Sequence, residues 1–337
     1  MMTTKDPMSA PLSTLDEVRA IAARLRDRMR YDVIGRDDII ELVLISLFAD
    51  GHVLLEDYPG SGKTTLAKAL GHAFVEEPED AHGIATFRRV QFTPDLLPSD
   101  ITGVTIFDTT TNVFTFRRGP VFASVLLVDE INRTSPKVQS ALLEAMAEKQ
   151  VTVDNVSHRL GDLFFVMATQ NPLDSVGTYP LPLAQLDRFL FKLTMKHIDP
   201  VSELQVLKTW GHPRVAMELP KVHRAEVVAG RALLREKVFV SQEVQQCLVD
   251  IATALRDTKR TRQGVSTRSL VQAIPALQTR ALLKGRDYVS SDDVEALAFP
   301  LFAHRLELMP GVNADALVRD ALRGPVDKLA RSTIGVE

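Results

Sequence analysis

The sequence has little of several features that would assign it to a special class. Its 337 residues contain one cysteine, Cys247, so no intrachain disulfide can form and a cytoplasmic location is the default expectation. Neither sign of charge dominates, because the formal net charge is −3 at pH 7. A balanced charge gives no basic footprint for DNA or RNA, so a nucleic-acid partner is disfavoured.

Long apolar runs are missing as well. The longest mainly apolar stretch, Leu42–Ala49, is far shorter than the roughly 20 residues that span a bilayer, so no membrane span is expected. The N-terminal Met1–Pro11 is polar and lacks the apolar centre of a signal peptide. The histidines are scattered, with no close pair at metal-ligand spacing. What remains is an ordinary globular composition, with a length that suggests about two domains.

The most informative stretch is a glycine-bearing loop between an apolar segment and a helix. The segment is His52–Leu55, the helix is expected to continue through Leu70, and the loop between them reads Asp57-Tyr58-Pro59-Gly60-Ser61-Gly62-Lys63-Thr64-Thr65. Such a loop directs backbone N–H groups inward, and the helix N-terminus adds free donors and a partial positive charge. Together they predict a cradle for a polyphosphate.

Two side chains of this loop add specificity. Lys63 can reach the β- and γ-phosphates of a nucleotide, and the Thr64 hydroxyl can hold Mg²⁺. The usual motif has glycine six residues before the lysine, where this chain has Asp57. A plain glycine-rich turn is the alternative, but such a turn has no need of a Lys-Thr pair at the start of a helix.

A pair of carboxylates follows a predicted central strand. Val125–Val128 is a continuous apolar run, as expected for a parallel strand buried on both faces, and it ends in Asp129 and Glu130. Carboxylates at the C-terminal end of such a strand face the crevice in which ligands bind. Asp129 is therefore expected to hold Mg²⁺, and Glu130 to orient and deprotonate the attacking water. A solvated acidic turn is the alternative.

Three further polar residues are candidates for the same site. Asn171 follows another apolar strand and could help to fix the water near the γ-phosphate, although an Asn-Pro turn is a common alternative. Arg188 could act as an arginine finger or pair with Asp187 at the surface. Arg268 is expected in the first turn of a helix, where a cation is unfavourable unless an anionic ligand lies nearby. An ordinary first-turn arginine is the alternative there.

A short turn containing Ile34 and Gly35 lies one predicted helix before the phosphate loop. It could line an adenine pocket, or it could be a plain connection between two helices. The residues themselves leave both interpretations open.

The pattern of the chain changes near residue 198. Residues 1–14 are expected to be disordered, and 15–198 alternate strands and helices as in a doubly wound nucleotide-binding domain. Two hairpins, near 104–117 and 151–159, interrupt this α/β part. Residues 199–337 carry helical patterns, which predict a second, all-helical domain.

Taken in order, these motifs resemble those of AAA+ ATPases, and among them the MoxR branch. The general likeness rests on the phosphate loop, Val125–Glu130, Thr169–Pro172, Leu186–Phe189 and Gly264–Arg268. The likeness to the MoxR branch rests on Gln91–Asp100, Asp129–Arg133, Ala168–Pro172, Gly177–Pro182, Gln185–Phe189 and Gly285–Val289. The resemblance covers roughly residues 15–310.

The resemblance implies a fold and an assembly. The fold would be α/β, an AAA+ P-loop NTPase αβα domain with a parallel five-stranded sheet followed by a helical lid domain. ATP or ADP and Mg²⁺ would be the cofactors. The family usually forms a ring, often a hexamer, with both hairpins facing the central pore.

The resemblance also implies a role for each candidate residue. Walker A would be Lys63 and Thr64, Walker B Asp129 and Glu130, sensor 1 Asn171, the arginine finger Arg188 and sensor 2 Arg268. Arg188 would act on the ATP of a neighbouring subunit, and Arg133 would also face a neighbour. The Asp57 substitution is tolerated in this branch, so it argues little against nucleotide binding.

MoxR-type ATPases are similar to chaperones that mature enzyme complexes or insert cofactors and metals. They typically act with a partner that carries a von Willebrand factor A domain, which this chain lacks. The first hypothesis is therefore an ATP-hydrolysing ring that remodels a protein client. The second is a slow nucleotide-switched scaffold, and the third, disfavoured by the balanced charge, is a nucleic-acid motor.

Overall fold

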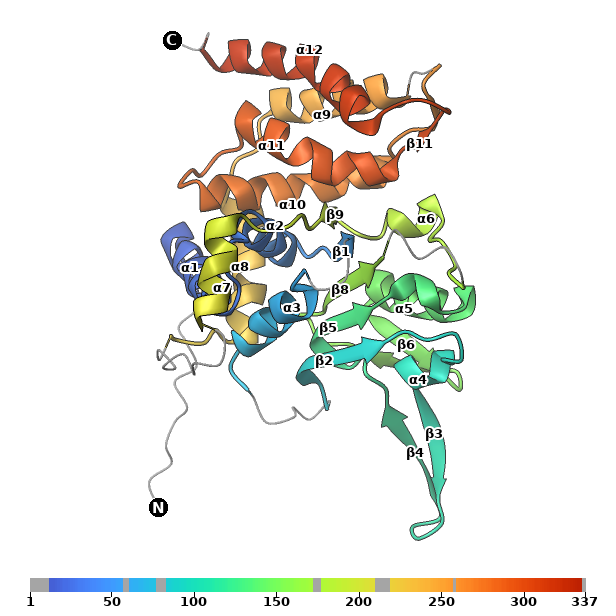
Figure 1. Cartoon of the computed structure of the whole chain (residues 1–337). Coiled ribbons are helices and arrows are strands. Elements are labelled where there is room, and N and C mark those ends of the chain that lie inside the picture. The colour runs from blue at the N-terminus through green and yellow to red at the C-terminus, as the bar shows by residue number, and fades with distance from the viewer. Residues whose placement is uncertain are drawn as a thin grey trace.

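A parallel sheet forms the centre of the structure. The structure is a computed structural model, which describes residues 12–56, 61–76, 83–171, 177–209, 219–256 and 259–334. The sheet has five strands in the order β2-β5-β8-β1-β9, all paired in parallel (Figure 1). Their bounds are β1 Val53–Glu56, β2 Ala85–Gln91, β5 Ala123–Asp129, β8 Phe165–Gln170 and β9 Phe191–Thr194. The predicted five-stranded parallel sheet is confirmed.

Strand alternation divides the core of the sheet into two apolar layers. In β5, Val125 and Leu127 join one layer and Leu126 and Val128 join the other, because successive side chains point to opposite faces. The first layer is covered by α1 (Leu15–Asp32), α2 (Asp37–Phe48) and α3 (Lys63–His72). The second is covered by α4 (Pro98–Thr102) and α5 (Pro136–Glu148). Helices therefore lie on both faces of the sheet.

Two hairpins stand apart from this sheet. They are β3–β4 (Gly103–Asp108 and Val113–Arg118) and β6–β7 (Gln150–Val153 and Val156–Arg159). The β3–β4 hairpin projects from the body of the protein, and its Phe114 is 70% exposed (Figure 1). Near its base the Phe116 ring stacks on His158 of the other hairpin, with ring centroids 3.9 Å apart. The two hairpins are thus joined at their bases while the tip of the first is free of the body.

The C-terminal part consists mainly of helices. The helices after β8 are α6 (Leu183–Leu186), α7 (Pro200–Thr209), α8 (Arg224–Lys237), α9 (Gln242–Arg256), α10 (Thr267–Leu283), α11 (Ser291–Phe302) and α12 (Ala314–Ile334). Two 3₁₀ turns, η1 (Ile131–Arg133) and η2 (Ala303–Arg305), follow β5 and α11. The sequence did not predict the short antiparallel ladder of β10 (Thr261–Gln263) with β11 (Glu307–Leu308).

The helical part packs tightly onto the sheet domain. Helix α8 lies against α1, where a Cβ added at Gly230 would come within 3.2 Å of both Phe48 and Val18. The apolar layer of the first sheet face continues through α2 into α10 and α11. In α9 the buried residues recur at helical spacing, as an amphipathic helix requires. Within the part of the chain described, no helix is both long and apolar enough to cross a membrane.

Candidate active site

The carboxyl ends of the sheet strands bring the predicted motifs to one edge. Residues paired across neighbouring strands include Gln91 with Asp129 and Leu55 with Thr169. Asp129 is the last residue of β5, and Asn171 follows β8 directly. Helix α3 begins at Lys63, after the loop that leaves β1. Parallel strands present such ends to a common crevice, so the sheet order places these motifs at one rim.

The phosphate loop is only partly described, because Asp57, Tyr58, Pro59 and Gly60 lie outside the described residues. Gly62 precedes α3 in a left-handed conformation, with φ of 93°. A Cβ added there would meet no atom of the described residues within 4 Å, so among them the space beside this glycine is open. Among the described residues, no side chain caps the N-terminus of α3. The N–H groups of a helix start point outward along its axis, which suits the binding of an anion.

The Asp129 carboxylate is buried and already paired. Its residue is 6% exposed, and its Oδ2 accepts from the Arg89 Nε at 2.6 Å. The Thr169 hydroxyl contacts the other oxygen at 3.4 Å. Arg89 lies on β2, which pairs with β5 directly. Arg89 and Thr169 were not among the site residues predicted from the sequence, because their proximity to Asp129 depends on the strand order.

Glu130 is held in a constrained position at the end of β5. Its backbone is left-handed, with φ of 58°, a conformation that non-glycine residues rarely adopt. Its N–H donates to the Thr169 hydroxyl at 3.0 Å, and its carboxylate accepts from Gln91 Nε2 at 2.6 Å. The Arg133 Nε lies 3.3 Å from the same carboxylate, so the arginine predicted to face a neighbour contacts its own Glu130 here.

A pocket of about 490 Å³ lies beside the predicted turn at Ile34 and Gly35. It is lined by residues from this turn, from the phosphate loop and from α7, including Ile34, Arg36, Ser61, Gly62, Thr65, Val206 and Leu207. Gly35 has φ of 69°, and a Cβ there would lie 2.5 Å from the Ser202 Oγ of α7. The Arg36 guanidinium donates to the Ser61 carbonyl at 3.2 Å and also to the Lys196 carbonyl. The turn thus lies directly beside the phosphate loop.

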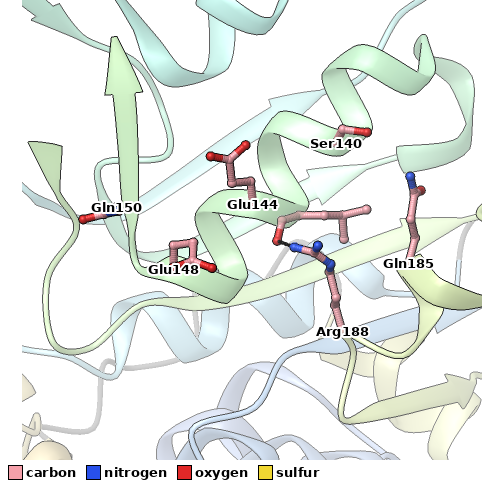
Figure 2. Close-up of a pocket in the computed structure, with 7 residues that line it drawn as sticks. Ser140, Glu144, Glu148, Gln150, Gln185 and Arg188 are labelled. Atoms are coloured by element: carbon pink, nitrogen blue, oxygen red, sulfur yellow. Dashed lines mark hydrogen bonds between the residues drawn. The ribbon is translucent and has the colours of Figure 1, made fainter. Parts of the chain in front are cut away.

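Arg188 lies in a different place, against α5 (Figure 2). Its guanidinium donates to the Leu143 carbonyl, in a pocket of about 540 Å³ that Glu144, Glu148 and Gln185 also line. Helix α5 covers the sheet face opposite α3. The alternative partner considered from the sequence, Asp187, instead pairs with Arg305 at 3.1 Å.

Arg268 lies in the first turn of α10 and is exposed. The turn is capped by Ser266, whose Oγ accepts from the Ser269 N–H at 3.1 Å. Burial, together with the nearby positive charge of Arg268, lowers the pKa of Arg305 to about 10, although the carboxylate of Asp187 opposes this shift. Arg268 therefore lies close enough to Arg305 for their charges to interact.

Comparisons with known proteins agree with this geometry. Residues 52–191 match the family model described as the ATPase family associated with various cellular activities, and residues 253–321 match the AAA lid domain. A Cytophaga hutchinsonii crystal structure, of a protein designated an ATPase, superimposes with a TM-score of 0.82 at 33% identity and covers 92% of this chain and 95% of that one.

Similar proteins indicate which branch of these ATPases the chain belongs to. The uncharacterized Bacillus subtilis protein YeaC is 42% identical over 327 residues, which are 94% of this chain and 98% of YeaC. Chaperone MoxR1 of Mycobacterium tuberculosis is 36% identical over 85% of this chain and 75% of its own length. Protein MoxR of Methylorubrum extorquens is 29% identical over 88% and 90%. With its phosphate loop, paired carboxylates and helical lid, the chain belongs to the MoxR family of AAA+ ATPases, enzymes that hydrolyse ATP.

Proposed function

We propose that this ATPase works as a chaperone that remodels or matures a protein client, acting as a ring with a partner that carries a von Willebrand factor A domain. Maturation could include the insertion of a metal or cofactor. The position of Arg188 carries the ring proposal. Because the Arg188 guanidinium lies against α5, on the sheet face opposite α3, it is poorly placed for its own phosphate loop and suited to a neighbour's.

The residues at the sheet edge fit a nucleotide and Mg²⁺. The open space beside Gly62 and the uncapped start of α3 suit phosphate oxygens, with Lys63 as the neutralising cation. Thr64 and Asp129 would hold Mg²⁺, since hydroxyl and carboxylate oxygens are its preferred protein ligands. When bound, the metal neutralises charge on the β- and γ-phosphates. To bind Mg²⁺, the Asp129 carboxylate would give up its contact with Arg89.

The remaining residues would act on water and on the leaving phosphate. Glu130 would accept the proton of the attacking water, and Asn171 would help to fix that water. Arg268 would approach the nucleotide from the lid, and Arg188 would supply the finger in trans. Arg133 would face the neighbouring subunit, and its contact with Glu130 would link that interface to the catalytic carboxylate. Ile34 would line the adenine side of the pocket, and Gly35 would let the turn pass close to α7 beside it.

The surface of the β3–β4 hairpin favours a protein client. Ile106, Phe107, Val113 and Phe114 are all at least 43% exposed, and the rings of Phe107 and Phe114 lie 5.0 Å apart. A projecting apolar surface of this kind suits an apolar polypeptide better than a phosphate backbone. A slow nucleotide-switched scaffold is the second candidate, because it needs the same site. Client-stimulated turnover would favour the chaperone.

Steady-state ATP hydrolysis at increasing protein concentration tests this proposal. We expect the specific activity of the wild type to rise with concentration, and to fall sharply at every concentration in Arg188→Ala. The control is Arg319→Ala, an exposed arginine on α12, which should behave as wild type. A specific activity independent of both concentration and Arg188 would mean a self-contained site, and would remove the basis for the ring.

A further inference from the structure

A polar cluster joins the loop that carries Arg188 to the helical part of the protein. At its centre is the carboxylate of Asp187, whose side chain is 20% exposed. Oδ1 of this carboxylate lies 3.1 Å from the Nε of Arg305, whose own side chain is 1% exposed. Asp187, which directly precedes the expected finger Arg188, is therefore held by the buried guanidinium of Arg305 in η2.

The same carboxylate reaches the first turn of α10. The Ser269 hydroxyl donates to Oδ1 of Asp187 at 2.9 Å, and the Ser266 hydroxyl donates to Oδ2 at 3.2 Å. Ser266 is also the N-cap of α10, and Ser269 is fully buried. Arg268, the expected sensor of the nucleotide, lies between these two serines in the chain. Its backbone is thus bracketed by two contacts with Asp187.

Arg305 extends the cluster to the other side of Arg188. Its guanidinium donates to the Phe189 carbonyl at 2.9 Å, to Gln272 Oε1 of α10 at 2.7 Å and to the Leu301 carbonyl at 2.9 Å. His304 Nε2 lies 3.1 Å from the same Phe189 carbonyl. Both chain neighbours of Arg188 are therefore anchored to the helical part, while its own guanidinium contacts α5.

From this geometry we propose that Asp187 is a positioning residue that couples the aim of Arg188 to the position of Arg268. The inference rests on the proposed roles of these two arginines and adds a link between them. When the first turn of α10 moves toward or away from a nucleotide, the contacts of Ser266 and Ser269 move Asp187 with it. The loop that aims Arg188 at the neighbouring subunit then moves in the same step.

A polar cluster suits this role better than an apolar contact between the loop and α10. An apolar contact between the loop and α10 could slide, but a carboxylate with an ion pair and two hydroxyl donors fixes direction as well as distance. The cluster is also continuous in the chain with both functional residues, one position from Arg188 and one from Arg268. It therefore ties the neighbouring subunit's site, which Arg188 would complete, to the nucleotide bound in the same subunit as Arg188.

A double-mutant cycle on turnover tests the coupling. Asp187→Asn keeps the shape of the side chain but removes the charge that faces Arg305. We expect it to lower kcat about threefold or more while KM for ATP changes by less than about twofold. Arg188→Ala should then cause a much smaller further loss in Asp187→Asn than in the wild type, because the finger is already misdirected.

The matched control is Asp293→Asn. Asp293 is another buried carboxylate paired with arginines, Arg280 and Arg286, but it lies in the helical part and is not bonded to the Arg188 loop. It should lower the unfolding temperature, leave kcat per folded molecule near the wild-type value, and leave the full effect of Arg188→Ala. If Asp187→Asn does not fold, Ser269→Ala removes one donor to Asp187 and should show the same kcat loss in weaker form.

The possible results separate this inference from the proposed function. Equal effects of Arg188→Ala in the wild-type and Asp187→Asn backgrounds would overturn the coupling and leave the finger intact. A wild-type kcat in both Asp187→Asn and Ser269→Ala would overturn it as well. If Arg188→Ala had no effect on turnover even in the wild type, Arg188 would not be an arginine finger. The proposed function and the coupling would then both be overturned.

Discussion

The Arg89 Nε lies 2.6 Å from Oδ2 of Asp129, so the carboxylate expected to hold Mg²⁺ already has a cationic partner. Removing that partner should make the metal easier to bind. We expect Arg89→Gln to lower the Mg²⁺ concentration needed for half-maximal ATP binding about two- to fivefold, since half of the arginine side chain is exposed and such pairs are weak.

A Mg²⁺ titration with a fluorescent ATP analogue measures this effect. The control is Arg88→Gln, because Arg88 directly precedes Arg89 on β2 and points to the opposite face of the strand. If Arg89→Gln instead needed more Mg²⁺ than the wild type, Arg89 would help to shape the metal site and would not compete with the metal.

Glu130→Gln should separate binding from hydrolysis. Glutamine keeps the size of the side chain but cannot accept the proton of water, so we expect turnover to fall about 100-fold or more while ATP affinity is kept. The measurements are single-turnover hydrolysis and equilibrium binding of ATP. Glu295→Gln, an exposed carboxylate on α11, serves as the control. Normal turnover in Glu130→Gln would contradict the assigned role.

Gly35→Ala should weaken both the fold and nucleotide binding. The backbone there has φ of 69°, and the new Cβ would lie 2.5 Å from Ser202 Oγ, so α7 must move away from the pocket. Gly285→Ala is a matched control, because its φ is 83° but the added Cβ would meet nothing within 4 Å. We expect the control to cost about 1 kcal/mol from the backbone alone, without a change in ATP affinity.

Urea unfolding and ATP titration of both glycine variants provide the measurement. Gly35→Ala should be the less stable of the two and should bind ATP more weakly. Equal ATP affinities of the two variants would argue that the turn is only a connection between helices, which is the other interpretation that the sequence left open.

Asp293 should make stability depend on acid pH. Burial alone would raise the pKa of Asp293, but hydrogen bonds from Arg286, from the Ser290 N–H and from Arg280 outweigh it, so the pKa lies below its ordinary 3.8. A lowered pKa in the folded state means that the carboxylate stabilises the fold above pH 3.8. That contribution is lost as the pH falls through the lower, folded-state value.

Urea unfolding of Asp293→Asn and the wild type at pH 7, 5 and 3 checks this dependence. At pH 7 the variant should be about 3 kcal/mol less stable, because it leaves two arginines facing a neutral group. The difference should persist at pH 5 and shrink at pH 3, because below pH 3.8 the carboxyl of the unfolded wild-type chain takes up a proton and the folded one does so only at lower pH. Asp16→Asn, from an exposed pair with Arg19, should change little at any pH.

Much of the fold follows from local patterns in the sequence. The apolar run before Asp129 is buried along its whole length, because a central parallel strand has a helical layer on each face. The glycine, lysine and threonine at the start of α3 need only a strand before them and a helix after them to make a phosphate cradle. These signals lie within a few residues of each other in the chain.

The partners of the site residues were harder to predict, because they come from distant segments. Arg89 and Gln91 lie on β2, and their side chains reach Asp129 and Glu130 only because β2 pairs with β5 in that register. Arg36 was missed because its bond to the Ser61 carbonyl joins two loops that the sequence does not relate. The one local hint was that Arg89 and Gln91 are two polar residues two positions apart on β2 and so point to the same face.

The sequence by itself determined that this protein binds and hydrolyses a nucleotide, since the phosphate loop and the paired carboxylates need no distant contact to be recognised. Only the tertiary structure decided what surrounds them. It placed Arg188 against α5 and paired Asp187 with Arg305, over a separation of more than 100 residues. Such contacts depend on how helices and strands pack in space, and a polar contact between two distant segments leaves no periodic pattern in the sequence, unlike the burial of a helix face.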